Sequence, residues 1–196
     1  MLNAVGREIP QEVLDETGKT VFQGTYQFDQ HEYTKAPVKA RTRIGGSGSK
    51  LESSIKEVLQ KCNAHDGMTI SFHHHFREGD YVINMVMEEI AKMGIKNLSI
   101  APSSIANVHE PLIEHIKNGV ITNNTSSGLR DKLGAAISPG IMENPVVIRS
   151  HGGRARAITA GDIHIDVAFL GAPSSDEYGN VNGTKGKATC GSLGYA

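Results

Sequence analysis

The segment from Gly67 to Asp80 limits what this chain can fold into more than any other part of its sequence. It reads GMTISFHHHFREGD, in which Met68 to Phe72 alternate apolar and small residues as a buried strand does. Gly79 and Asp80 then supply a turn and an N-cap for a helix pattern. The apolar face of that helix carries Val82, Val86, Ile90 and Met93. The segment therefore predicts a strand, a polar loop and a helix, in that order.

The same alternation repeats along the chain and predicts the fold class. Further strands are expected at 97–101, 120–122, 145–149 and 163–170, with helices at 111–119 and 128–137. Strands that alternate with helices at this spacing predict an α/β fold with a mainly parallel open sheet, right-handed crossovers and helices on both faces. A chain of 196 residues can bury one good core, so we expect one main domain.

Residues 1–48 are expected to form an N-terminal extension, and residues 49–196 the α/β domain. The extension shows no sustained apolar period. Its positive cluster, Lys35 to Arg43, is expected to be a solvated face, with a contact to a partner or a phosphate as the alternative. The glycine-rich segment from Gly45 to Ser49 predicts a joint between the extension and the domain. Its glycines do not complete a phosphate-binding fingerprint, so a phosphate-binding loop is the less favoured alternative. Ser49 and Glu52 then form a capping-box pattern for a helix whose apolar stripe is Leu51, Ile55, Val58, Leu59 and Cys62.

The end of the chain, Thr184 to Ala196, is rich in glycine and small residues and shows no closing helix pattern. A parallel sheet that ends on such a segment leaves an edge or a face uncovered. We therefore expect the α/β domain to be incomplete at its C-terminal edge and the chain to be part of a longer protein.

The composition argues against nucleic-acid and membrane partners. Charged residues make up 21% of the chain and the formal net charge is -1, so no overall basic field attracts nucleic acid. No apolar run approaches the length of a membrane span, and the first residues lack the pattern of a signal peptide. The two cysteines, Cys62 and Cys190, are expected to be free thiols in a reducing compartment. These features predict a cytoplasmic protein.

The histidine-rich loop after the first strand is the first candidate site. In open α/β sheets ligands bind outside the carboxyl ends of the strands, and His73, His74, His75 and Arg77 occupy that place. We interpret it as an anion or carbonyl site. Side chains alternate along an extended segment, so His73 and His75 can converge while His74 faces elsewhere. That geometry does not favour a metal site, and buried structural histidines are the open alternative.

A second polar segment, HGGRAR from His151 to Arg156, follows the strand at 145–149 on the same rim. Gly152 and Gly153 would let backbone amides approach a ligand, and arginines offer forked donors to carboxylates. Arg154 and Arg156 would align in an extended loop and diverge in a helix, so exposed arginines at a helix start are the alternative. Ser103 and Ser104 form the loop after the strand at 97–101.

Three other patterns are set aside. His109 and His115 are too far apart around a helix to match a helical metalloprotease motif. Asp176 and Asn180 lie in a turn-rich loop, where such side chains commonly hold their own turns. The sequence contains no Gly-x-Ser-x-Gly pattern, which excludes a serine nucleophile of that type.

Several runs of the sequence resemble the alpha subunit of citrate lyase, and the similarity covers essentially the whole chain. The three longest are TISFHHHFREGDYV from Thr69, HEPLIEHIKNGV from His109 and SHGGRARAI from Ser150. Shorter ones are NAVGREIP from Asn3, HIDVAF from His164 and CGSLGYA from Cys190. The family's chains are much longer, and this chain corresponds to their first half.

The resemblance implies a citrate CoA-transferase fold and activity. Such proteins have two related α/β halves with the active site between them, and they exchange acetate for citrate on a CoA-like thiol. That thiol belongs to the prosthetic group of the acyl carrier gamma subunit, and the beta subunit then cleaves the citryl thioester. The resemblance therefore implies citrate and an acetyl thioester as substrates, no tightly bound cofactor, no metal, and an oligomer within the full complex.

The resemblance also suggests roles for residues. The loop from His73 to Phe76 would supply backbone amides to the thioester carbonyl, with His73, His74 and His75 as the catalytic residues. Citrate would attack the thioester directly through a transient anhydride, so no nucleophile is assigned to the protein. The expected substrate-binding residues are Phe76, Arg77, Ser103, Ser104, His151, Gly152, Gly153, Arg154 and Arg156. Rival interpretations are a CoA-transferase or thioesterase for another acid, a non-catalytic binding half-domain and, more remotely, a metal-dependent hydrolase.

Overall fold

The structure, a computed structural model, describes residues 1–24, 48–73 and 76–191, apart from the side chain of Arg77. The chain forms two compact units, Met1–Lys35 and Ala36–Ala196. Several predictions fall outside the described residues: the basic cluster from Lys35 to Arg43, most of the joint at Gly45 to Ser49, His74 and His75. The domain boundary expected at residue 49 follows an undescribed stretch and stays a prediction.

The first unit contains a short helix and a β-bridge. Helix α1 spans Gln11–Thr17 and ends at Gly18, whose φ of 63° is in the left-handed region that glycine tolerates. An antiparallel bridge joins Leu2 to Glu8, and Val21 is buried. Residues 1–24 of the N-terminal extension therefore contain local structure, which the lack of a sustained apolar period did not predict.

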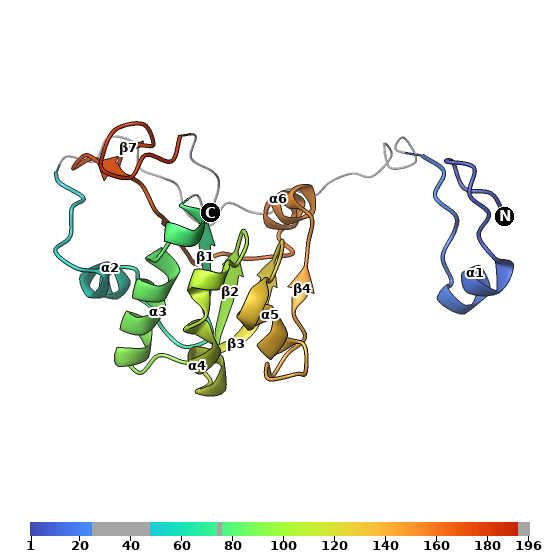
Figure 1. Ribbon diagram of the computed structural model, residues 1–196, viewed down its shortest axis with the longest axis horizontal. Helices are drawn as coiled ribbons and strands as arrows, with labels where there is room; N and C mark the ends of the chain where they lie inside the picture. The colour runs from blue at the N-terminus through green and yellow to red at the C-terminus, as the bar shows by residue number, and fades with distance from the viewer. Residues whose placement is uncertain (25–47, 74–75, 192–196) are drawn as a thin grey trace. The chain divides into compact units, whose positions relative to one another are not determined.

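The second unit is built on a parallel sheet, which confirms the predicted α/β class (Figure 1). Its five strands lie in the order β4-β3-β2-β1-β5, and each neighbouring pair is parallel. The strands are β1 Thr69–His73, β2 Leu98–Pro102, β3 Ile121–Ser126, β4 Val147–Ile148 and β5 Val167–Leu170. A two-stranded antiparallel hairpin follows, made of β6 Ser174–Ser175 and β7 Val181–Asn182.

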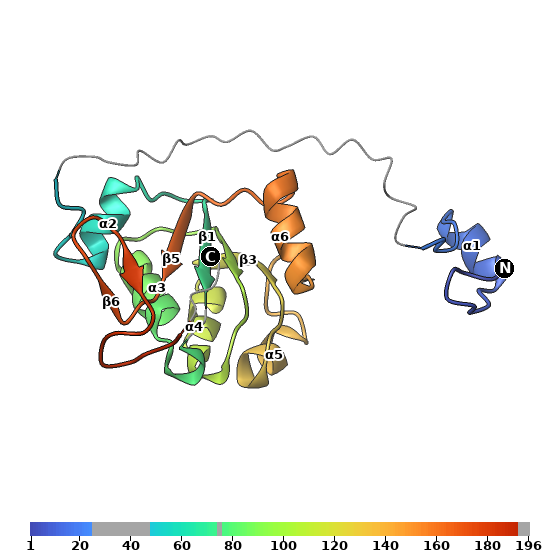
Figure 2. The ribbon, with the colours of Figure 1, turned by 90° about the horizontal axis from the view of Figure 1, so that it is seen from above.

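Helices lie on both faces of the sheet. Figure 2 shows α3, α4 and α5 on one face and α6 on the other. The helices of this unit are α2 Ile55–Lys61, α3 Val82–Lys92, α4 Leu112–Lys117, α5 Asp131–Ile137 and α6 His151–Ala160. Two short 3-10 turns lie between a strand and the helix that follows it: η2 Arg77–Gly79 between β1 and α3, and η3 Asn107–His109 between β2 and α4. Among the described helices, none has the length and apolar character needed to cross a membrane.

The two faces of the sheet differ in polarity. Side chains alternate along a strand, so Ile100 and Ala101 of β2 point to opposite faces. Ile100 belongs to the main apolar core with Ile70, Leu98 and helix α3, whereas Ala101 packs in a small cluster with Ala157 of α6. We call the side that carries α6 the second face. Parallel sheets usually bury two apolar faces, so a second face with little apolar packing is unusual.

The start of α2 was predicted wrongly. The helix begins at Ile55, and its N-cap is Ser54, whose Oγ accepts a hydrogen bond from the Glu57 backbone N at 3.2 Å. The Glu57 carboxylate in turn accepts from the Ser53 backbone N at 3.1 Å. The S-x-x-E pattern therefore occurs twice, and the second copy directly precedes the apolar stripe. Leu51, assigned to that stripe from the sequence, is 62% exposed.

This assignment of the cap predicts the outcome of two matched substitutions. Ser54→Ala removes the acceptor for a helix N–H and should lower the free energy of unfolding by about 1 kcal/mol. Ser49→Ala, the same change at the rejected cap, should alter it by less than about 0.5 kcal/mol. Urea unfolding followed by circular dichroism measures both values. Equal losses in the two variants would contradict the assignment.

Candidate functional site

Backbone hydrogen bonds join the carboxyl ends of β1, β2, β3 and β4 into one rim. The backbone N of Ser103 donates to Phe72 O at 2.9 Å, and that of Ser127 donates to Ser103 O at 3.1 Å. The backbone N of Arg149 donates to Ser126 O at 2.9 Å. The rim thus orders polar residues from three loops beside His73, at the position where open α/β sheets bind ligands.

The loop after β1 is anchored at both of its described ends. His73 closes the strand opposite Leu170 of β5 and is half-buried. The Phe76 ring packs onto the backbone of Gly171, where an added Cβ would lie 2.8 Å from Phe76 Cε2. A side chain at that glycine would push the ring, and with it the loop, out of place. Phe76 therefore has a structural contact here, and its substrate-binding role remains a prediction.

A buried histidine that the sequence analysis did not assign holds the other side of the loop. His109 Nδ1 accepts a hydrogen bond from the Ala106 backbone N at 3.0 Å, and its Nε2 donates to Asp80 O at 2.8 Å. Asp80 Oδ1 in turn accepts from the Val82 backbone N at 3.1 Å. His109 thus ties η3 to the start of α3. The sequence around His109 contains no feature that distinguishes a buried histidine from an exposed one, so this role could not be predicted.

His73 shares a small pocket with Asp80, Ser104 and His109. Its volume is about 10 Å³, close to that of one water molecule. Burial lowers the pKa of His109, while its hydrogen bond to Asp80 O acts in the opposite direction. The neutral imidazole is therefore the form that fits this network, because both of its nitrogens already have defined roles.

The second polar segment, expected as a loop, is the helix α6, so of the two arrangements left open for its arginines the diverging one is correct. Ser150 Oγ caps α6 by accepting from the Gly153 backbone N at 3.0 Å, and an added Cβ on Gly153 would lie 3.0 Å from that Oγ. Arg154 points inward and is 1% exposed, with Nη2 donating to Ser71 Oγ at 2.8 Å. Arg156 points outward and pairs with Asp162. Helical geometry separates two side chains that an extended loop would have aligned.

The predicted site residues are therefore only partly brought together. His73, Ser103 and Ser104 lie along the rim, while His151 and Gly152 are exposed at the start of α6. Arg154 reaches β1 at Ser71, two residues before His73, so α6 packs against the strand that carries the histidine loop. Arg149 and Ser127, which the sequence analysis did not single out, belong to the same rim.

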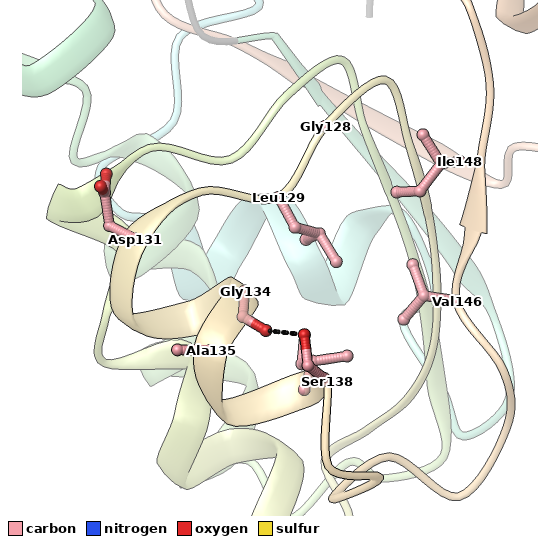
Figure 3. A pocket seen from close by; sticks show the side chains of 9 residues that line it. Gly128, Leu129, Asp131, Gly134, Ala135, Ser138, Val146 and Ile148 are labelled. Carbon is pink, nitrogen blue, oxygen red and sulfur yellow. Dashed lines mark hydrogen bonds between the residues drawn. The ribbon is translucent and has the colours of Figure 1, made fainter.

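A pocket of about 590 Å³ lies apart from these residues, between α5 and the segment from Val146 to Ile148 (Figure 3). Leu129, Ile137, Val146 and Ile148 make its lining largely apolar. The only charged residue among its lining residues is Asp131. A carboxylate there disfavours an anionic ligand, so this pocket is not a candidate for binding a carboxylic acid.

Within the described residues, no group of three or more histidine, cysteine, aspartate or glutamate side chains could hold a metal ion. His74 and His75 are outside that part of the chain, so the expected absence of a metal stays a prediction. Asp176 accepts hydrogen bonds from the backbone N of Tyr178 and Asn180, both at 2.9 Å. The prediction that this side chain holds its own turn is confirmed.

Comparisons with known proteins give one consistent result. The family model for the citrate lyase alpha subunit (CitF) matches residues 48–196. The citrate lyase alpha chain of Haemophilus influenzae is 50% identical over 171 residues, which cover 87% of this chain and 34% of that one. The citrate lyase alpha chain of Escherichia coli is 54% identical over 158 residues, covering 81% and 30%. The chain therefore spans about a third of the length of these curated relatives.

A solved structure agrees with these matches. It is a crystal structure assigned to the alpha subunit of citrate lyase from Streptococcus mutans, in complex with citrate. The TM-score is 0.81 and the sequence identity 66%, over 98% of this chain and 37% of that chain.

The state of His109 predicts how stability depends on pH. The folded protein favours the neutral ring, so the free energy of unfolding should fall as the pH drops below the ordinary histidine value of 6.5. His115, whose pKa burial also lowers, contributes with the same sign. His109→Gln should reduce the difference between urea unfolding at about pH 7.5 and at about pH 5.

The control for this experiment is His65→Gln, which changes an exposed histidine and should keep the wild-type pH dependence. An unreduced pH dependence in His109→Gln would show that the buried ring does not contribute.

Proposed function

This chain belongs to the citrate lyase alpha subunit family, and on that premise we propose that it forms part of a citrate CoA-transferase. In the proposed reaction, a carboxylate of citrate attacks the carbonyl carbon of an acetyl thioester and expels the thiolate. The thiolate then attacks the citryl carbonyl of the resulting mixed anhydride and releases acetate. The products are the citryl thioester and acetate. The observation that carries the proposal is the family match over residues 48–196, supported by the citrate-bound relative.

The role proposed for the histidine loop is to stabilise charge on the acyl oxygen. Both steps develop negative charge on a carbonyl oxygen, and donors aimed at that oxygen lower the barrier. His73 is the last residue of β1, and Phe76, which follows three residues later, packs on Gly171. The backbone amides from His73 to Phe76 are proposed as the donors. His73, His74 and His75 are proposed to complete this site. Because citrate itself is the nucleophile, the loop needs only to position and polarise the reactants.

The structure changes the role proposed for Arg154. Its guanidinium is buried against Ser71, so it supports β1 below the histidine loop rather than presenting a free fork to citrate. His151 and Gly152, at the exposed start of α6, remain candidates for substrate contact. Arg156 pairs with Asp162 on the outer side of α6 and is the weakest of the predicted ligands.

The partners and cofactors follow from the same proposal. We propose that the acetyl group arrives on a CoA-like prosthetic group of the acyl carrier gamma subunit, and that the beta subunit cleaves the citryl product. No tightly bound cofactor is needed for the exchange, because both acyl groups enter with the substrates. A cytoplasmic location and an oligomeric complex belong to the proposal as well.

A second candidate function is favoured by one observation. The chain spans only about a third of its curated relatives, so it could serve as a non-catalytic unit that binds citrate or a partner chain. A related transferase or thioesterase acting on another acid would share the same fold, because fold alone does not identify the substrate.

A transfer assay tests the proposal. The protein is assayed in its native assembly with citrate and an acetyl thioester of the carrier, and acetate release is measured. We expect citrate-dependent release, and we expect His73→Ala to lower kcat/KM at least tenfold, or about 1.4 kcal/mol. The matched control is His65→Ala, an exposed histidine remote in sequence from the rim, which should leave the rate unchanged.

Three results would count against the proposal. Release driven by another acid and not by citrate would assign a different substrate. Citrate binding without any transfer in the assembly would favour the non-catalytic function. Equal rates in His73→Ala and His65→Ala would remove the histidine loop from the site.

A further inference from the structure

A polar pocket on the sheet contains several buried groups that the proposed mechanism does not use. Its volume is about 350 Å³, within the range of pockets that hold small-molecule ligands. Its polar lining comes from the starts of β1 and β2, from β3, from the end of β4 and from the loop before β5. These residues are Thr69, Ser99, Asn123, Asn124, Thr125, Arg149, Asp162 and His164.

Strand register explains why these side chains gather in one place. Thr69 lies opposite Ser99, and Ser99 lies opposite Asn123, so three short polar side chains stand in a row across β1, β2 and β3. Thr125 is two residues beyond Asn123 and lies opposite Val147 of β4. Arg149 follows two residues after Val147, and side chains two apart along an extended segment share a face.

Two side-chain atoms on this face of the sheet are buried without a hydrogen-bond partner in the part of the chain that the structure describes. They are Oγ1 of Thr125 and Nε of Arg149. Asn124 does not belong with them, because it lies opposite Ile100 of the main core and its side chain points to the other face. Buried polar groups in folded proteins are nearly always paired, so two unpaired groups that border one cavity indicate a bound polar ligand.

The donors in the pocket favour an anion with oxygen acceptors. Arg149 brings a permanent positive charge and a guanidinium that suits carboxylate geometry, while Thr125 adds a neutral donor. The negative charge of Asp162 is compensated, since its carboxylate pairs with Arg156. His164 already has a partner in the protein, since its Nε2 lies 3.0 Å from the Asp166 carboxylate.

We infer that this pocket is a carboxylate-binding subsite, in which Arg149 and Thr125 hold a carboxyl group of a di- or tricarboxylic acid. The identity of that acid as citrate rests on the proposed function. Arg149 joins the subsite to the rim, because its backbone N is bonded to Ser126 O at the carboxyl end of β3. A tricarboxylate held at Arg149 by one carboxyl group can direct another toward the rim that carries His73.

The test uses a substitution that keeps volume and removes a polar group. Thr125→Val deletes an unpaired buried atom, so this variant should not lose thermal stability. It should weaken citrate binding at least tenfold in calorimetric titration of the native assembly, and Arg149→Ala should do the same. In the transfer assay the KM for citrate should rise at least tenfold while the KM for the acetyl thioester stays unchanged. The control is Arg130→Ala, at an exposed arginine outside this pocket.

The alternative outcomes separate this inference from the proposed function. If wild-type protein transfers acetyl to citrate and both variants bind citrate normally, the subsite is wrong and the proposed function stands. If inorganic phosphate binds as tightly as citrate and is lost in Arg149→Ala, the pocket is a general anion site and its carboxylate assignment fails. If Arg149 and β3 are fully protected from hydrogen exchange and labelling in the native assembly without citrate, protein covers the pocket and the inference is overturned.

Discussion

The buried contact between Arg154 and Ser71 is the interaction on which the second face of the sheet depends. Arg154 Nη2 donates to Ser71 Oγ at 2.8 Å, and Ser71 Oγ donates to Ala101 O at 3.0 Å. Helix α6 packs on this face with few apolar side chains, mainly Ala157 against Ala101. A hydrogen bond made by a charged group typically contributes about 1.5–3 kcal/mol, more than the burial of one methyl group of an alanine. A polar contact, rather than an apolar stripe, therefore positions α6.

This contact also explains which parts of the fold the sequence could predict. Strands β1 and β2 and helices α3 and α4 pack through the main apolar core, and their apolar periods predicted them within one or two residues. Helix α6 has no apolar face, since its inward positions are Arg154 and Ala157, so its sequence looked like a polar loop. The prediction for the start of α2 failed for another reason. Two capping patterns occur in succession, and only packing distinguishes them.

The candidate site was predictable in position and less so in detail. Because parallel strands end on one edge, the loops after β1, β2 and β4 had to share a rim, and the backbone bonds at Ser103 and Arg149 confirm that they do. What could not be predicted is the direction of each side chain. Arg154 turned inward because α6 is helical, and His109 became a buried link because η3 lies against the start of α3. Both outcomes depend on contacts between segments far apart in sequence.

Two polar networks stabilise different elements around the rim. On the side of the main core, His109 and Asp80 hold the start of α3, and Phe76 on Gly171 holds the loop after β1. On the second face, Nη2 of Arg154 donates to Ser71 and holds α6 against β1, while Arg149 and Thr125 keep buried polar atoms without a partner among the described residues. A hydrogen bond between two elements stabilises the fold, whereas unpaired donors cost free energy until a ligand or water meets them. The second face thus carries Arg154, which supports the strand, and Arg149, which is available to a substrate, although the two arginines are close together in the sequence.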